Sequence, residues 1–342
     1  MKKRIAWIDI AKGICIISVI AGHEGDELAN KIVFAYHLTV FFLLSGYTMK
    51  AEYNRDTLNK RFASLMVPYF ITCFCIMCMN VINSVILDRN GSVAVVTEMM
   101  GTDLLKTFWA SGAATSFQGF DIGGRIGAIW FLPAMFFATW IVQAVLRYVP
   151  EKRLQYAAVG LIAVAGSISN RFVLLPFAIQ PAMFAAPFVL LGYRIREKNL
   201  LDQMEWKHFV VCLALCLIGI VIGISEMSFV TSSAPDILLS SLFSIASSFV
   251  IIYIAKKIEW CKPLEFIGRN SLIILCVHLL DMTVIGNYTW LVYEWLGLPY
   301  TFWARFLQDL FWIAVVTAAV LFVKKAFSSH KKHGNCTADR WS

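Results

Sequence analysis

The chain has 342 residues, of which 59% are hydrophobic and 15% are charged, and its formal net charge is +8. A soluble domain carries about 25% charged residues, and the apolar residues here fall in long blocks rather than in stripes, which excludes an ordinary soluble globular protein. The basic residues lie in short clusters between these blocks, without interleaved aromatic rings, which argues against a nucleic-acid-binding protein.

The apolar blocks predict membrane-spanning helices, because about 20 apolar residues cross the hydrocarbon core of a bilayer. We expect an all-α, polytopic transmembrane helical bundle of about ten helices. The predicted spans are residues 5–22, 32–49, 64–87, 127–146, 154–169, 172–192, 209–225, 237–255, 270–286 and 302–323. We assign residues 1–327 to this transmembrane domain and residues 328–342 to a polar, disordered cytoplasmic tail.

The long connection at residues 88–126 has a moderately apolar middle, Val93 to Ala110. It is too charged to span a membrane, and we predict an amphipathic helix along the interface.

The distribution of basic residues predicts the orientation of the chain. An even number of spans places both termini on one side of the membrane. The loops and chain ends on that side contain 23 of the 30 lysine and arginine residues. Because basic loops remain in the cytoplasm, we expect both termini to be cytoplasmic.

Cysteine usage predicts neither disulfides nor a metal site. Seven of the nine cysteines lie inside apolar blocks. Cys73, Cys75 and Cys78 are spaced loosely like metal ligands, but no histidine or carboxylate accompanies them. We interpret them as small packing residues.

Several ionisable side chains lie within or near the predicted spans, where inserting a charge costs roughly 2.5–3.5 kcal/mol. They are Asp9, Lys12, His23, His37, His278 and Asp281. Residues of this kind usually face a cavity and serve a function. Asp281 follows His278 by about one helical turn, from where it could orient the imidazole.

The first predicted span carries a polar stripe. Lys12 and His23 project from nearly the same face, roughly 16 Å apart along the axis. Asp9 joins that face and could pair with Lys12. His37 begins the second span, so the two imidazoles could meet in the outer third of the bilayer. The alternative is that the ion pair is structural and the histidines only bridge helices.

A neutral imidazole, with a pKa of about 6.5, is well suited to take a proton from a hydroxyl. A cation nearer the cytoplasm suits a phosphate-bearing or thioester donor. The stripe therefore favours group transfer to a hydroxyl.

Further motifs accompany these residues in order. They are Gly22-His23 after Lys12, Tyr36-His37 before Phe41-Phe42-Leu43-Leu44-Ser45-Gly46-Tyr47, Lys60-Arg61 before Pro68, Trp130-Phe131-Leu132, Gly192-Tyr193, and Gly268-Arg269-Asn270-Ser271-Leu272 with His278. In this ordered set the chain resembles the type-three acyltransferase family, the bacterial inner-membrane O-acyltransferases that include fucose O-acetylase-like members. The resemblance runs from Arg4 to about Val323. It departs at Lys12, where the family usually has arginine with its bidentate geometry, and at Tyr36, where phenylalanine is common.

The resemblance implies transfer of an acyl group, commonly acetyl, from cytoplasmic acyl-coenzyme A to a hydroxyl of a cell-surface glycan or lipid-linked sugar. It also implies a bacterial-type inner membrane, with membrane lipid and the glycan as partners, and no metal. Our catalytic candidates are His23, His37, Lys12 and Asp9, with one histidine as general base. The substrate-binding candidates are Arg61, Trp130, Ser45, Tyr47, Asn270 and His278.

Two other functions are compatible with a polar stripe. A transporter of a small solute such as serine would use one, but would be expected to show broken helices or paired halves around a midplane site. Neither signal is clear in the sequence. A purely structural membrane anchor would leave the intramembrane histidines unexplained.

Overall fold

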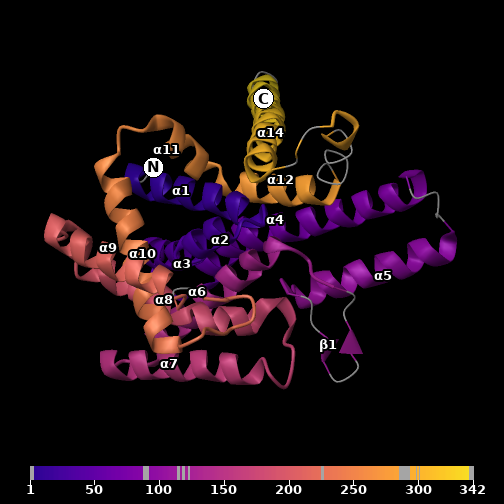
Figure 1. Ribbon diagram of the computed structural model, residues 1–342. Helices are drawn as coiled ribbons and strands as arrows, with labels where there is room; N and C mark the ends of the chain where they lie inside the picture. Colours follow the sequence, from indigo (N-terminus) through magenta and orange to yellow (C-terminus); the bar gives the residue numbers. More distant parts are fainter. Residues whose placement is uncertain are drawn as a thin grey trace.

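The computed structural model describes residues 4–87, 92–113, 116–117, 120–121, 124–224, 227–284, 293–297, 299 and 301–338. Helices pack side by side to form the body of the molecule, and a short hairpin lies at its edge (Figure 1). The predicted fold class, an all-α membrane helical bundle, is confirmed.

The elements follow one another in the order of the predicted spans. The helices are α1 (Ala6–His23), α2 (Glu27–Val33), α3 (His37–Thr48), α4 (Arg55–Ile82), α5 (Val93–Trp109), α6 (Phe131–Tyr148), α7 (Lys152–Ser169), α8 (Ile179–Glu197), α9 (Trp206–Val221), α10 (Ile237–Lys257), α11 (Lys262–Arg269), α12 (Ser271–Val284) and α14 (Phe302–Ala338). Short helical turns are η1 (Asn83–Leu87), η2 (Ala128–Trp130), η3 (Pro176–Ala178) and η4 (Leu200–Asp202). The hairpin pairs β1 (Ser116–Phe117) with β2 (Phe120–Asp121) in antiparallel register.

Within the described residues, 7 helical stretches are long and apolar enough to cross a membrane, or up to 8 if α11 and α12 form one span with a 68° bend. The remaining predicted spans are also helical. Residues 154–169 fall in α7, which is less apolar, and residues 209–225 begin in α9, an apolar helix of 16 residues. The chain is therefore a multi-pass membrane protein.

The structure corrects several predicted boundaries. The second span is broken at residues 34–36, which separate α2 from α3. The third begins earlier, at Arg55, because the Asn54 side chain caps α4 by accepting from the Thr57 N–H at 2.8 Å. As a result Arg61 lies on a helix instead of in a loop.

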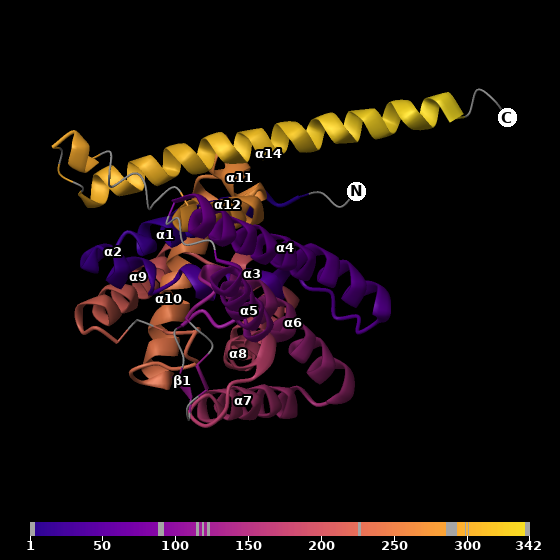
Figure 2. The same cartoon turned by 90° about the vertical axis from the view of Figure 1, so that its right-hand side faces the viewer.

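The connection at residues 88–126 contains the expected helix, α5, which begins after a Ser92 cap. At the other end of the chain, α14 continues to Ala338, into the segment that we assigned to the polar tail. No proline interrupts the backbone hydrogen bonds there. Figure 2 shows α14 lying along one side of the bundle and extending past it. It packs mainly on α12.

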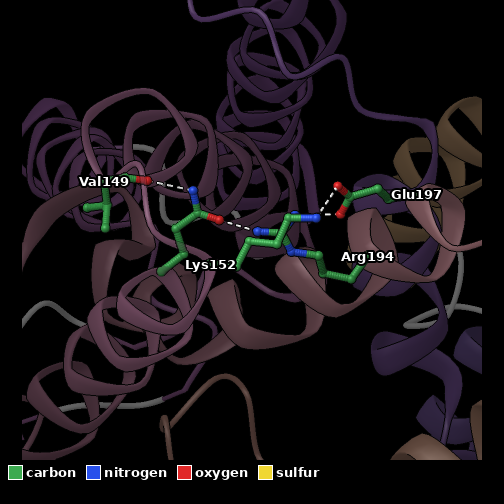
Figure 3. A network of polar contacts seen from close by, with 5 residues as sticks. Val149, Lys152, Arg194 and Glu197 are labelled. Carbon is green, nitrogen blue, oxygen red and sulfur yellow. Dashed lines mark hydrogen bonds and ion pairs between the residues drawn. The ribbon is translucent and has the colours of Figure 1, made fainter.

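A polar network joins the turn after α6 to α7 and α8 (Figure 3). Arg194 of α8 donates to the Gln155 side-chain oxygen and, at 2.5 Å, to Glu197. Gln155 in turn donates to the Val149 carbonyl at 2.6 Å, and Lys152 pairs with Glu197 at 2.8 Å. The buried guanidinium thus fixes how α7 meets α8.

The closest helix crossings are made by glycine. A Cβ on Gly46 of α3 would lie 1.9 Å from the Val189 carbonyl oxygen of α8, and a Cβ on Gly192 would lie 1.9 Å from the Leu43 oxygen. Small residues allow such approach between helices in membranes, where packing rather than the hydrophobic effect drives association. The Ser-Gly-Tyr and Gly-Tyr motifs therefore include a backbone contact between α3 and α8.

We expect Gly46→Ala and Gly192→Ala each to destabilise the protein. The added methyl meets backbone, which cannot rotate away, so the cost should reach or exceed the roughly 1–3 kcal/mol typical of overpacking. The unfolding midpoint of the purified protein in detergent measures this. Gly160→Ala on α7 is the matched control, because a Cβ there meets nothing within 4 Å. Equal midpoints for all three variants would contradict the close crossing.

Candidate active site

A cavity of about 950 Å³ lies between α1, α3, α4, the start of α6, the segment before α10, and α12. It collects side chains that are far apart in the sequence. The predicted site residues that line it are Lys12, His23, His37, Ser45, Arg61 and Trp130.

Two cations occupy one end of this cavity. Lys12 lies in the first half of α1, and Arg61 lies near the start of α4. Arg61 Nη1 is 3.4 Å from Ser45 Oγ, at the far end of α3. No Asp or Glu is among the described residues lining the cavity. The two positive charges therefore face a described lining that has no carboxylate, which suits an anionic ligand.

Two imidazoles occupy the other end. His23 is the last residue of α1, and His37 is the first residue of α3. His23 Nδ1 is 2.7 Å from the Val19 carbonyl oxygen, and His37 Nδ1 is 2.6 Å from that of Val33. Since a carbonyl only accepts, Nδ1 carries the hydrogen in both rings, which leaves each Nε2 as a proton acceptor when the ring is neutral.

The break between α2 and α3 explains the position of His37. It ends α2 at Val33, so the Val33 carbonyl is available to the imidazole four residues later. The Phe34 ring also packs edge-on against His37, with centroids 5.1 Å apart. His37 is consequently buried and held in one orientation, whereas His23 is exposed.

His278 lies behind His23 rather than on the cavity wall. The two ring centroids are 5.2 Å apart, and His278 is fully buried. Its Nδ1 is 4.0 Å from Asp309 on α14, and neither ring nitrogen has a hydrogen-bond partner among the described residues. The side chain of Asp281, the partner expected from the sequence, lies outside what the structure describes. Asp309 was missed because it is 31 positions away on another helix.

Three other predicted site residues do not line the cavity. Asp9 pairs with Arg269 of α11, with 3.6 Å between its carboxylate and the guanidinium Nε. Tyr47 packs edge-on against Trp7, with centroids 5.4 Å apart. Asn270 donates to the Phe266 carbonyl at 2.8 Å, at the bend between α11 and α12. Asp9 and Tyr47 therefore join helices around the site, whereas Asn270 caps the end of α11.

The expected pair of Asp9 with Lys12 is not among the ion pairs of the described residues. The reason is α11, which the sequence pattern did not predict. A Cβ on Gly268 would lie 1.6 Å from the Asp9 carbonyl oxygen, so α11 presses directly on α1. That contact brings Arg269 to the carboxylate and leaves Lys12 to the cavity.

Trp130 and Arg125 complete the histidine end. A Cβ on Gly112 would lie 2.1 Å from Trp130 Cδ1, so the indole packs closely against the backbone at Gly112. Arg125 also lines the cavity. From the sequence it is a cation in a loop, although the glycines at positions 124 and 127 favour an unusual backbone.

A model of the family described as an acyltransferase domain matches residues 5–324. The match includes every described residue that lines the cavity. No curated protein and no solved structure matches the chain.

Because Asp9 pairs with Arg269, we expect Arg269→Met to lower stability more than Lys12→Met. Arg269 also pairs with the buried Glu265. Its side chain is 43% exposed, so we expect a loss of only about 1–2 kcal/mol, below the value for a fully buried pair. Unfolding midpoints in detergent provide the measurement, and Arg269→Lys, which keeps the charge, is the control. A larger loss in Lys12→Met would assign the carboxylate to Lys12 instead.

Proposed function

The chain belongs to the type-three acyltransferase family, and we propose that it is a membrane-embedded O-acyltransferase. The donor is cytoplasmic acyl-coenzyme A, with acetyl as the leading acyl group. The acceptor is a hydroxyl of a surface glycan or lipid-linked sugar. One observation carries this proposal: a single cavity has cations at one end and two proton-accepting imidazoles at the other.

The cationic end suits the donor. Lys12 and Arg61 line the cavity at the ends of α1 and α4 that the charge bias predicts to be cytoplasmic. Coenzyme A carries phosphates, and unpaired Lys and Arg side chains bind them by charge and by hydrogen bonds. From Lys12 to His23 the axis of α1 rises roughly 16 Å, so a donor held at Lys12 can extend its thioester toward the histidines.

The histidine end suits the transfer itself. Nε2 of one imidazole takes the proton of the acceptor hydroxyl as its oxygen attacks the thioester carbonyl. The C–S bond then breaks, the acyl group stays on the oxygen, and the protonated imidazole returns its proton to the departing thiolate. Nδ1 remains bound to a backbone carbonyl, which holds the ring in the required tautomer.

We assign the base to His37, with His23 orienting the acceptor or stabilising the developing oxyanion. His37 is buried and fixed by both Val33 and Phe34. His23 is exposed and is supported from behind by His278. His278 then acts through His23, as a positioning residue.

A solute transporter is the second candidate function. The 68° bend between α11 and α12 is the kind of broken helix on which transporters build their sites. A cavity of this size would also hold a small amino acid. The two functions differ in what the histidines do, since only the enzyme requires one of them to take the proton of a hydroxyl that attacks a thioester.

The direct test supplies the purified protein with radiolabelled acetyl-coenzyme A and extracted surface polymers. In this assay we expect His37→Asn to lower acyl transfer by about 10²–10⁴-fold, the usual contribution of a general base. The asparagine amide can still donate to the Val33 carbonyl but has no Nε2. His23→Asn should cause a smaller loss, and both variants should keep the wild-type unfolding midpoint.

Full transfer in both well-folded variants would refute the catalytic assignment. If the same variants instead stopped uptake of a solute such as serine into liposomes, transport would replace acyl transfer as the function.

At the opposite end, Lys12→Met or Arg61→Met should raise the apparent KM for acetyl-coenzyme A more than it lowers kcat, because the cations bind the donor in both ground and transition states. Arg61→Lys, which retains a charge, should lose less. Steady-state kinetics with varied donor measure both quantities. Unchanged donor KM in both methionine variants would remove these side chains from the donor site.

A further inference from the structure

We propose that the acceptor is an anionic glycan, and that its charged group binds at Arg125 in a second, smaller cavity beside the histidines. This inference rests on the proposed function and specifies its acceptor. The second cavity has a volume of about 260 Å³ and lies between α4, α5, α12 and the segment at residues 124–127. It shares Arg125, Gly127, Leu279 and Met282 with the larger cavity, so the two cavities lie next to each other along these residues.

The lining of the second cavity has the groups that bind sugars. Asn80, Asp103, Lys106 and Thr107 contribute amide, carboxylate, ammonium and hydroxyl groups. Asn80 donates to Asp103 at 2.8 Å, and Lys106 approaches the other carboxylate oxygen at 3.3 Å. These side chains therefore form an ordered polar wall, and they can both donate to and accept from hydroxyls.

The charge balance of this cavity is positive. Asp103 is the one carboxylate in its described lining, and Lys106 neutralises it. Arg125 forms no ion pair with any residue that the structure describes. A guanidinium without an ion-pair partner among the described residues, on the wall of both cavities, suits the carboxylate of an acidic sugar or the phosphate of a lipid-linked sugar, both of which it can bind bidentately.

The backbone around Arg125 is well defined. The Ile126 N–H donates to the Ser111 carbonyl at 2.8 Å. Gly124 and Gly127 adopt φ values of 113° and 80°, which favour glycine, and a Cβ on Gly127 would lie 3.1 Å from the Leu279 side chain. These constraints fix the backbone from which the Arg125 side chain reaches the lining of both cavities.

The position of Arg125 in the large cavity suits binding of the acceptor and not of the donor. Lys12 and Arg61 already serve the opposite end of the large cavity. Arg125 shares its end with His23, and the wall between the two cavities includes Leu279, next to His278. A sugar whose anionic group contacts Arg125 can therefore present a neighbouring hydroxyl to the imidazoles.

The test uses the full-length protein in liposomes with radiolabelled acetyl-coenzyme A. Surface glycans of the source cells are separated into a neutral fraction, an acidic water-soluble fraction and an acidic lipid-linked fraction. We expect label in an acidic fraction, and the two acidic fractions distinguish a carboxylated polymer from a sugar phosphate on lipid. Label confined to the neutral fraction would overturn the inference while leaving acyl transfer intact.

Arg125→Gln should lower kcat/KM for the labelled acidic acceptor by about 10- to 100-fold, as expected for losing hydrogen bonds to a charged group, mainly through the acceptor KM. The KM for acetyl-coenzyme A should not change. Arg171→Gln is the matched control, since this exposed arginine after α7 lines neither cavity. Equal activity of the two glutamine variants would overturn the inference, as would a fall in kcat without a rise in the acceptor KM. Absence of label from every fraction with the wild-type protein would overturn the proposed function itself.

Discussion

The site depends on two backbone contacts that only glycine permits. Gly46 and Gly192 bring α3 against α8, and Gly268 brings α11 against α1. Because α1 and α3 carry Lys12, both catalytic-candidate histidines and Ser45, their positions relative to the rest of the bundle are set by these crossings. In lipid, where apolar side chains gain little from meeting one another, such close packing is the main force that holds helices together.

Holding α1 and α3 in place produces a cavity with different side chains at its two ends. Lys12 and Arg61 lie at one end, where the described lining has no carboxylate, and at the other end two imidazoles bind backbone carbonyls through Nδ1. In the proposed reaction the cations would bind the phosphates of the donor, and an imidazole would take the proton of the acceptor hydroxyl. The carboxylates near the site are used instead to pair with cations, Asp9 with Arg269 and Glu24 with Arg305, outside the cavity.

Helix ends and helix breaks place the reactive groups. His23 is the last residue of α1, and His37 follows the break after α2, so both imidazoles can bind backbone carbonyls without disturbing a continuous helix. The bend at Asn270 has a similar effect, because it lets α11 close on α1 while α12 lines the cavity. Discontinuous helices are tolerated in a membrane protein where they border protein or a cavity, as they do here.

The sequence by itself determined the features that depend on local periodicity and composition. These are the membrane class, the helical segments, the shared face of Lys12 and His23, and the place of His37 at the start of a helix. The tertiary structure alone decided which distant residues meet: Asp9 with Arg269, His278 with Asp309, and Arg125 with the cavity. Helical spacing predicts neighbours only along one helix, whereas these contacts depend on how α11, α14 and a glycine-rich loop pack against α1 and α12.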